Sequence, residues 1–451
     1  MNTLKHNLYD RIAPLLDDSV IAAKTRVRPA PAKAVAGEPP AAAEERLRIA
    51  LKSVFVPTAQ VRQIIKQLVG GSIGFSATRY TDSLEYLRLV YNRNFADDFP
   101  DAAAICLTGL AGSGKSALTQ AIARLLQIED PIAVGNGHDP FPAAHCINLS
   151  FRTHPTVAAS LRKCAYPDEE SAPARARLDQ LTKHARWRAF RDFSVLMFAD
   201  ECQFITHGST SSAKATSTLL TLLGLNVPLV YVANYSLCHT LKTRPQQDQH
   251  RLLSRPIVLQ PESAGTDDWR DYLAECKRVA GSWFKVPVLT YERELFQMTF
   301  GLKRIVIGLI CLAYRHMRQE GRSSVAIEDL RKAYLSPDNL HRSEVEALLA
   351  HMVNGIQPRK DLLCPFEVPS PLASMAAQLQ EERKIKIVES YTEESLNVSE
   401  RNALDVLKLK VGCPTLTENK PRKNSSRKAP PITLDALMAG DAKMHSMTGV
   451  R

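Results

Sequence analysis

The sequence lacks any long uninterrupted apolar run and any closely spaced pair of cysteines. No window approaches ~18 consecutive apolar residues, the length that spans a bilayer, and the N-terminus has no apolar signal-peptide core. The 9 cysteines are scattered without a C-x-x-C pair. Most of them stand in apolar runs, which is typical of reduced core thiols rather than disulfides or zinc ligands. These absences predict a soluble, cytoplasmic protein that does not contact a membrane.

The composition is that of a folded, basic protein. Hydrophobic residues make up 45% of the 451 positions, which excludes global disorder. The length allows about two or three domains. With 58 Lys and Arg against 47 Asp and Glu, the net charge is +11. An excess of this size favours a polyanionic partner, of which nucleic acid is the commonest.

The strongest motif lies between residues 105 and 126. The apolar residues 105–107 have strand length, the loop 109–116 fits G-x-x-x-x-G-K-[ST], and apolar residues at helical spacing follow. Glycines let backbone N–H groups curl around a polyphosphate, and the helix N-terminus adds a favourable dipole. Lys115 can reach the β- and γ-phosphates, and Ser116 can ligate Mg²⁺. The predicted cofactors are therefore ATP and Mg²⁺, and the loop residues predicted to hold the nucleotide are Gly109, Leu110, Ala111, Gly112, Ser113, Gly114, Lys115, Ser116 and Ala117.

A second signature follows the apolar run 194–199, which ends in two carboxylates, Asp200 and Glu201. With Ser116, Asp200 would hold the Mg²⁺ shell, while Glu201 would orient and deprotonate the attacking water. A further strand is predicted over 228–233 and ends in Asn234. A polar side chain at that strand tip can touch the γ-phosphate or the attacking water.

Three arginines are candidates for completing an ATPase site. Arg251 and Arg255 precede a predicted fifth strand, and either could act as an arginine finger toward a neighbouring subunit's γ-phosphate. Pro256 biases Arg255 toward extended backbone at the start of the strand, whereas Arg251 lies in a helical turn. We therefore favour Arg251 as the finger. Arg304 begins an apolar helix and can point back to the phosphates across a domain cleft.

Residues 153–193 form a polar insertion with helical spacing and many basic side chains. One interpretation is a solvated helical face; the other is an element that faces DNA. The second is favoured because the insertion lies between two strands of a nucleotide-dependent core. The candidate DNA-binding residues are Arg162, Lys163, Lys183 and Arg186.

We predict an α/β fold, with a P-loop core built on a parallel sheet and a helical lid after it. The Ala/Pro-rich stretch 28–44 cannot build a core and predicts a linker, and 420–431 predicts a disordered basic segment. Amphipathic helices are expected before the loop, one of them opened at Pro57 and closed at Gly70–Gly71. The predicted domains are a flexible leader (1–44), the α/β nucleotide-binding domain (45–262), the helical lid (263–356) and a largely disordered tail (357–451) with short interaction segments at 373–390 and 432–439.

Taken together, these motifs resemble those of an AAA+ ATPase, over roughly Val54 to Gly355. Within AAA+ proteins the chain is most similar to transposition regulators of the TnsC/TniB type and more distantly to MuB. The residues that carry this finer resemblance are Phe55-Val56-Pro57-Thr58, Asp200-Glu201-Cys202-Gln203, where that group tends to carry DE-x-[HQ], and Gly301-Leu302-Lys303-Arg304.

The resemblance implies an ATPase that forms a ring or filament on duplex DNA, tolerates any sequence, and contacts transposase and a target-selecting protein. The family roles carry over to Lys115, Ser116, Asp200, Glu201, Asn234 and Arg304, but the arginine finger does not carry over uniquely. The alternatives are a replication initiator or helicase loader, a RuvB-like DNA motor, and a nucleotide-binding scaffold with little turnover. No helix-turn-helix pattern follows the lid, which disfavours a sequence-specific initiator, and an intact Glu201 disfavours a scaffold.

Overall fold

The computed structural model describes residues 3–32, 38–92, 104–128, 130–135, 137–168, 173, 175–206, 211–367, 377, 380 and 381. The chain divides into two compact units: Met1–Leu348 with Gln357–Ser370, and Leu349–Ile356 with Pro371–Arg451. In the second unit, Gln380 Nε2 donates to the carbonyl of Val353 at 2.7 Å. The first unit contains the sheet, the nucleotide loop and most of the lid.

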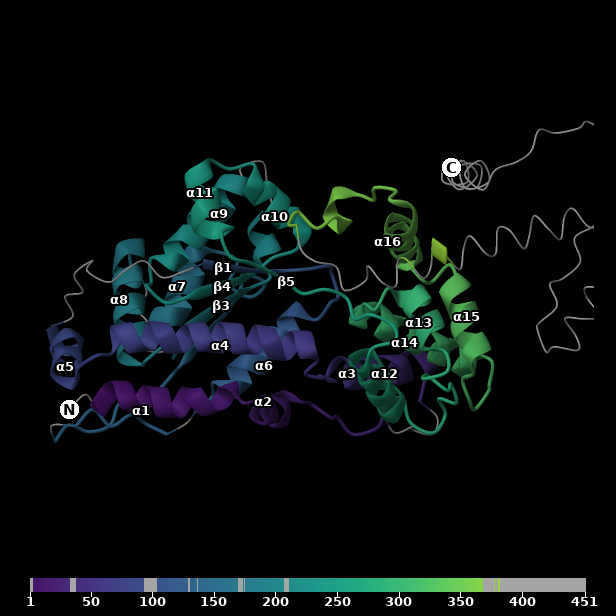
Figure 1. The fold of residues 1–451 in the computed structure, drawn as a ribbon, viewed down its shortest axis with the longest axis horizontal. Helices are drawn as coiled ribbons and strands as arrows, with labels where there is room; N and C mark the ends of the chain where they lie inside the picture. The colour runs from purple at the N-terminus through teal and green to yellow at the C-terminus, as the bar shows by residue number, and fades with distance from the viewer. Residues whose placement is uncertain are drawn as a thin grey trace, which may run out of the picture. The chain divides into compact units, whose positions relative to one another are not determined.

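Five parallel strands form one sheet in the order β2-β3-β4-β1-β5 (Figure 1). The strand that precedes the nucleotide loop, β1, therefore lies between β4 and β5. Parallel neighbours bring the carboxyl ends of their strands to the same edge of the sheet. The strands predicted over 105–107 and 228–233, and the fifth strand predicted after Arg255, are confirmed. The five strands are β1 (Ala104–Thr108), β2 (Cys146–Ser150), β3 (Leu196–Asp200), β4 (Leu229–Val232) and β5 (Pro256–Val258).

Helices cover both faces of the sheet, as an all-parallel sheet requires (Figure 1). Alternate residues of β3 belong to different cores: Phe198 packs in one cluster, and Met197 and Ala199 pack in the other. The first cluster includes residues of α1 (Thr3–Ile12), α4 (Ala59–Arg79), α5 (Ser83–Asn92) and α6 (Lys115–Leu125). The second includes residues of α7 (Val157–Ala165), α8 (Leu178–Arg191), α9 (Ser211–Leu223), α10 (Tyr235–Lys242) and α11 (Gln246–Leu252).

The start of the chain differs from the predicted flexible leader. The segments α1, η1 (Ala13–Leu16) and α2 (Asp18–Thr25) are helical. Leu4, Leu8 and Ile12 are at most 1% exposed and pack in the core of the α/β domain. These residues are spaced four apart, so they share one face of the helix, and burying that face holds the segment in place.

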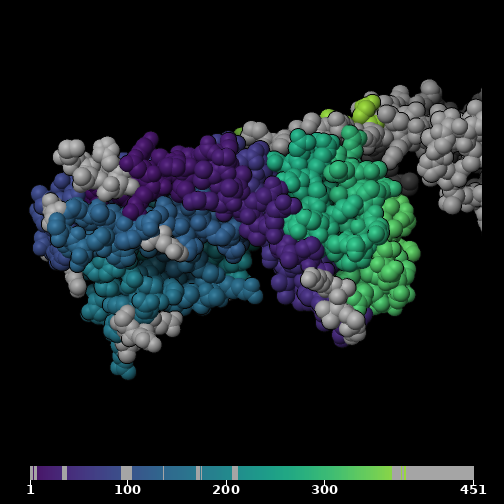
Figure 2. Space-filling model, turned by 90° about the horizontal axis from the view of Figure 1, so that it is seen from below, coloured from purple at the N-terminus to yellow at the C-terminus, as the bar shows by residue number. Residues whose placement is uncertain are grey.

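Residues 26–52 leave the α/β domain and pack on the lid, although the predicted boundary put residues from 45 onward in the nucleotide-binding domain. Arg26 forms an ion pair with Asp271 at 2.5 Å, and the Ala32 N–H donates to the carbonyl of Val279 at 2.8 Å. The following helix, α3 (Pro40–Lys52), packs on the lid helix α14 (Lys303–Gln319). Figure 2 shows these N-terminal residues, in purple, running from the blue α/β domain to the green lid.

Helix α4 continues beyond Gly70–Gly71, where the sequence predicted its end. Its buried face extends through Ser72 and Ser76, whose hydroxyls donate to backbone carbonyls of the preceding turn at 2.7 and 2.8 Å. At its end, Arg79 donates to the carbonyl of Asn226 at 2.6 Å. Tertiary packing thus overrides the low helix propensity of glycine here.

The lid is helical, as predicted. Its helices are α12 (Asp267–Ala280), α13 (Glu292–Thr299), α14 (Lys303–Gln319), α15 (Ile327–Leu335) and α16 (Arg342–Asn354). No single helix in the described part of the chain is long and apolar enough to span a membrane; α13 and α14 pass that test only as a pair, bent by 103°.

The first residues of the predicted tail are ordered on the α/β domain. After η4 (Lys360–Leu362), the Leu363 carbonyl lies 3.1 Å from His239 Nε2, and the Lys242 ammonium lies 5.0 Å from the ring centre of Phe366. The predicted segments 420–431 and 432–439 lie outside the described residues, as does most of 373–390.

Candidate nucleotide-binding site

The loop between β1 and α6 has a backbone that only glycine can adopt at three positions. Gly109, Gly112 and Gly114 have φ values of +154°, +85° and +107°. A Cβ at Gly109 would lie 2.4 Å from the carbonyl oxygen of Leu259, and one at Gly112 would lie 2.6 Å from the Cβ of Arg304. The glycines are therefore required both by their conformation and by close neighbours on either side of the loop.

Lys115 lies in the first turn of α6 and turns back over the loop. Its ammonium donates to the carbonyls of Gly109 and Leu110, both at 2.8 Å. Burial and, to a lesser extent, the nearby Arg304 guanidinium lower the pKa of Lys115 from 10.5 to about 8, while Asp200 and Glu201 oppose the shift. These four charged groups thus share one site.

Two further features of the loop fit a bound polyphosphate. The Ser113 hydroxyl is buried without a hydrogen-bond partner among the described residues. The N-cap of helix α6 is Gly114, which has no side chain to cap the helix and so leaves its first N–H groups for an anion. Together with a partly buried ammonium, these unpaired donors suit a group with several anionic oxygens.

The two carboxylates stand at the end of β3. Asp200 is the last strand residue, and one of its carboxylate oxygens accepts from the Glu201 N–H at 2.7 Å. Glu201 has a φ of +58°, a left-handed backbone that is uncommon for a side chain of this kind. Gln203 Nε2 donates to the Glu201 carboxylate. This bond and the turned backbone fix the direction of Glu201.

The candidate Mg²⁺ ligands are Ser116 on α6 and Asp200 on β3. Among the described residues no group of three or more His, Cys, Asp and Glu forms a metal cluster. A hydroxyl and one carboxylate suit Mg²⁺, which commonly completes its shell with phosphate oxygens and water rather than with protein ligands alone.

Asn234 follows β4 and caps α10. Its side-chain oxygen accepts from the Leu237 N–H at 3.1 Å and from the Ser236 hydroxyl at 2.9 Å. The capping bonds hold the side chain at the strand tip and leave its Nδ2 group as a donor. Sequence reasoning predicted the strand tip but not this capping role.

The lid reaches the loop through the start of α14. The Arg304 N–H donates to the Gly112 carbonyl at 3.2 Å. Gly301, in the turn before α14, has a φ of +66°, and a Cβ there would lie 2.1 Å from the carbonyl oxygen of Glu262. The turn between α13 and α14 is thus locked against the linker that follows β5, which places the Arg304 backbone on the loop. The role of its guanidinium toward the phosphates stays a prediction.

The two candidate arginine fingers occupy different kinds of backbone. Arg251 is exposed on α11. Arg255 is also exposed, and its carbonyl accepts from the Cys106 N–H at 3.1 Å, at the edge of the sheet where β5 begins. The predicted contrast between helix and strand edge is present, and the choice of finger stays a prediction.

The candidate DNA-binding residues lie on α7 and α8. Arg162 and Lys163 donate to the carbonyls of Pro173 and Pro167, at 2.8 and 3.0 Å. Arg186 donates through two nitrogens to the Gly224 carbonyl, at 2.9 and 2.7 Å. Lys183 is exposed on α8. Three of the four therefore also hold backbone in place.

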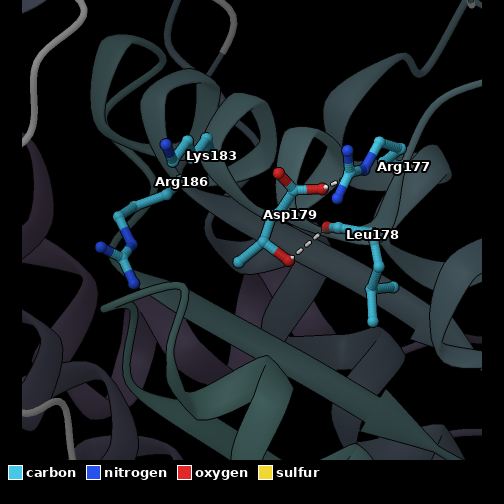
Figure 3. A pocket seen from close by; sticks show the side chains of 6 residues that line it. Arg177, Leu178, Asp179, Lys183 and Arg186 are labelled. Atoms are coloured by element: carbon cyan, nitrogen blue, oxygen red, sulfur yellow. Dashed lines mark hydrogen bonds and ion pairs between the residues drawn. The ribbon is translucent and has the colours of Figure 1, made fainter.

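An open groove runs beside the first turns of α8. Figure 3 shows Lys183 and Arg186 on one side of it, and Arg177 paired with Asp179 on the other; that ion pair measures 3.5 Å. Thr182 also lines the groove, and its hydroxyl donates to the Leu178 carbonyl at 2.8 Å. Three cations against one carboxylate make the groove electropositive.

Sequence reasoning missed two charged residues beside the loop. Lys303 Nζ lies 3.4 Å from Glu262 Oε1, and the two side chains are 16% and 10% exposed. Lys303 could have been predicted as a site residue, because it precedes Arg304 at the start of the lid helix. Glu262 lies in an irregular linker, where no sequence pattern marks it as a site residue.

No protein-family model matches the sequence, and no curated protein matches it. Several solved structures are similar to this chain at low identity. The Aeropyrum pernix ORC1 protein in complex with DNA is 15% identical, with 87% of this chain and 83% of that chain covered and a TM-score of 0.38. Cdc6p from Pyrobaculum aerophilum is 16% identical (66% and 84% covered, TM-score 0.36). The Thermotoga maritima RuvB Holliday junction branch migration motor is 12% identical, with 66% of this chain and 78% of that chain covered and a TM-score of 0.31.

The fold is that of an AAA+ ATPase. The strand order 2-3-4-1-5, the glycine loop after β1, the carboxylates after β3 and a helical lid in contact with the loop together define it. The predicted fold class is therefore confirmed. Transposition, DNA binding and ATP turnover are matters of function, which a fold does not decide.

Proposed function

We propose that this protein is an ATP-dependent, DNA-binding regulator of transposition that oligomerises on target duplex DNA and couples target selection to transposase recruitment. The observation that carries the ATPase part is the convergence of Lys115, Asp200, Glu201 and Arg304 around a glycine loop with unpaired donors. This arrangement has the parts for Mg²⁺-dependent hydrolysis of ATP to ADP and phosphate, used as a switch.

Each residue has a chemical role in this proposal. The N–H groups at the start of α6 and the Lys115 ammonium bind the polyphosphate. Ser116 and Asp200 would hold Mg²⁺, which would supply positive charge toward the phosphate oxygens. Glu201, held by Gln203, accepts the proton of the attacking water, and Asn234 Nδ2 donates toward it. Arg304 meets charge that develops on the phosphates.

The DNA-binding part rests on charge. The chain carries a net charge of +11, and the groove beside α8 brings together Arg177, Lys183 and Arg186. Lysine and arginine side chains of this kind bind backbone phosphates and do not by themselves distinguish bases, so we propose sequence-tolerant binding of duplex DNA. A cytoplasmic location follows from the same proposal.

The transposition part rests on the resemblance, and two of the three segments that carry it, those of Gln203 and Arg304, lie at the nucleotide site. Phe55 pairs with Val27 where the chain crosses between lid and α/β domain, Gln203 holds Glu201, and Arg304 contacts Gly112.

The full-length protein tests the proposal directly. We expect it to bind ATP, to hydrolyse it in the presence of Mg²⁺, and to form oligomers on duplex DNA that negative-stain electron microscopy detects. The Lys115→Ala variant should lose both ATP binding and assembly on DNA, because the loop has no other cation that can bridge the β- and γ-phosphates. Unchanged ATP affinity in this variant would overturn the loop assignment.

Two further measurements separate the regulator from its alternatives. A transposase encoded beside this gene should bind the ATP-loaded, DNA-bound oligomer and not the Lys115→Ala protein. ATP-driven strand displacement or branch migration would instead identify a DNA motor and overturn the regulator assignment.

A further inference from the structure

A second lid cation lies beside the nucleotide loop. A Cβ at Gly114 would lie 3.5 Å from Lys303 Cδ and 3.8 Å from its Nζ. Lys303 is the first residue of α14 and precedes Arg304, so adjacent lid residues flank adjacent parts of the loop: Arg304 lies at Gly112 and Lys303 lies at Gly114.

The Lys303 ammonium has donors to spare. An ammonium carries three N–H donors, and in this structure one carboxylate oxygen, from Glu262, lies 3.4 Å away. The ammonium also lies over the face of the Tyr272 ring, in a cation–π contact whose ring centre is 5.7 Å from Nζ. Neither contact satisfies an ammonium as fully as the 2.8 Å carbonyl contacts of Lys115 do.

Glu262 is held in place by the backbone around it. It is 8% exposed, and its own carbonyl is in close contact with Gly301. Replacing a buried ion pair with apolar residues is often neutral or stabilising, so such a pair is weak evidence for stability alone. An ion pair next to a phosphate-binding loop places a cation where it can bind phosphate, which an apolar pair could not do.

We propose that Lys303 binds the phosphates of the nucleotide held by the loop, as a second lid cation, and that Glu262 positions Lys303. This inference rests on the proposed nucleotide binding at the loop. In the free protein Glu262 holds the ammonium beside Gly114, and in the bound protein the phosphates take up its remaining donors. The lid therefore contacts the nucleotide through two successive residues, Lys303 and Arg304.

Because the two side chains carry opposite charges, removing each charge should change ATP affinity differently, which a purely structural pair would not do. If Lys303 binds phosphate, Lys303→Met removes a favourable charge and should weaken ATP affinity about tenfold or more. Glu262→Gln keeps a side-chain oxygen that can accept from the ammonium and so position it, but removes a negative charge that repels the phosphates, so affinity should hold or rise. A structural pair would give the same direction of effect for both variants.

The experiment measures the affinity of the full-length protein for a fluorescent ATP analogue and for ADP, alongside thermal unfolding. Lys303→Arg keeps the cation and should retain most of the affinity. The double variant Lys303→Met with Glu262→Gln should recover stability, because no buried charge is left unpaired, and should still bind ATP weakly. The matched control is Arg331→Met, which breaks another lid ion pair, to Glu294 at 2.6 Å, and should leave affinity unchanged.

The outcomes separate this inference from the proposed function. If the wild-type protein binds no ATP, the proposed function fails. If the wild-type protein binds ATP and Lys303→Met binds it equally well, only the role of Lys303 fails. A loss of affinity in Glu262→Gln as large as that in Lys303→Met would assign the pair a structural role and overturn the inference.

Discussion

The lowered pKa of Lys115 predicts that nucleotide affinity falls as the pH rises through about 8. In the free protein, burial and Arg304 lower this pKa from 10.5 to about 8. At that value Lys115 is about nine-tenths protonated at pH 7 and about one-tenth protonated at pH 9. A bound phosphate favours the charged form and raises the pKa again. Binding above pH 8 must therefore include the uptake of a proton.

The size of the expected change in ATP affinity follows from this protonation equilibrium. The apparent Kd for ATP should rise about tenfold between pH 7 and pH 9, provided that the pKa in the complex lies above that range. Isothermal titration calorimetry in buffers of different ionisation enthalpy, at pH 8.5, should detect the uptake of about three-quarters of a proton per nucleotide. In the free protein the same shift makes the Lys115 contribution to stability rise with pH between about 8 and 10.5, because the unfolded chain binds more protons there.

Two variants isolate the titrating group. A Lys115→Arg protein that still binds ATP should show a flat pH profile, because a guanidinium does not deprotonate in this range. A hydrogen bond with Cys106 lowers the pKa of the Cys238 thiol, which lies near Lys115, and Cys238→Ser removes it as a second titrating group. The reasoning is refuted if wild-type affinity is constant from pH 7 to 9, or if the profile is lost in Cys238→Ser.

The remaining predictions concern turnover, DNA and subunit contacts. Glu201→Gln should bind ATP normally but hydrolyse it about 10²–10⁴-fold more slowly, because the base is lost while binding groups remain; wild-type turnover would move the base elsewhere. Lys183→Glu should weaken duplex binding and reduce the slope of log K against log salt by about one; an unchanged slope would exclude a phosphate contact. Arg251→Ala should lose ATPase activity and regain some when mixed with Lys115→Ala protein, and rescue of Arg255→Ala alone would reverse the choice of finger.

The parts of the site that the sequence predicts are those in which local pattern and chemistry coincide. Each buried strand is a short apolar run, and the loop after β1 needs glycine at positions where other residues would clash. Asp200 ends β3, and Glu201 and Asn234 come within two residues of the ends of β3 and β4, so the parallel strands bring all three to one edge of the sheet. The sequence predicts a parallel sheet but no strand order, so the place of β1 between β4 and β5 is known only from the structure.

The parts that the sequence did not predict depend on contacts between distant segments. Gly70 and Gly71 look like a helix end, yet α4 continues because its face stays buried as far as Arg79. Glu262 lies in a linker without periodicity, and only the fold brings it to Lys303. The Ala/Pro-rich composition likewise does not predict that residues 26–52 pack on the lid, because the lid helices lie more than 200 residues away in the sequence.

That packing has a mechanical consequence for the loop. Helix α6 begins at the loop, and near its other end Arg124 donates to the Thr25 carbonyl at 3.3 Å and lies 6.0 Å from the ring centre of Phe55. Phe55 pairs with Val27 through two backbone hydrogen bonds, of 3.0 and 3.2 Å, where the chain crosses between the α/β domain and the lid. The lid is thus tied to both ends of α6, through Arg304 at the loop and through this crossing at Arg124. A change at the loop that shifts α6 must therefore either move the lid with it or break one of these two connections.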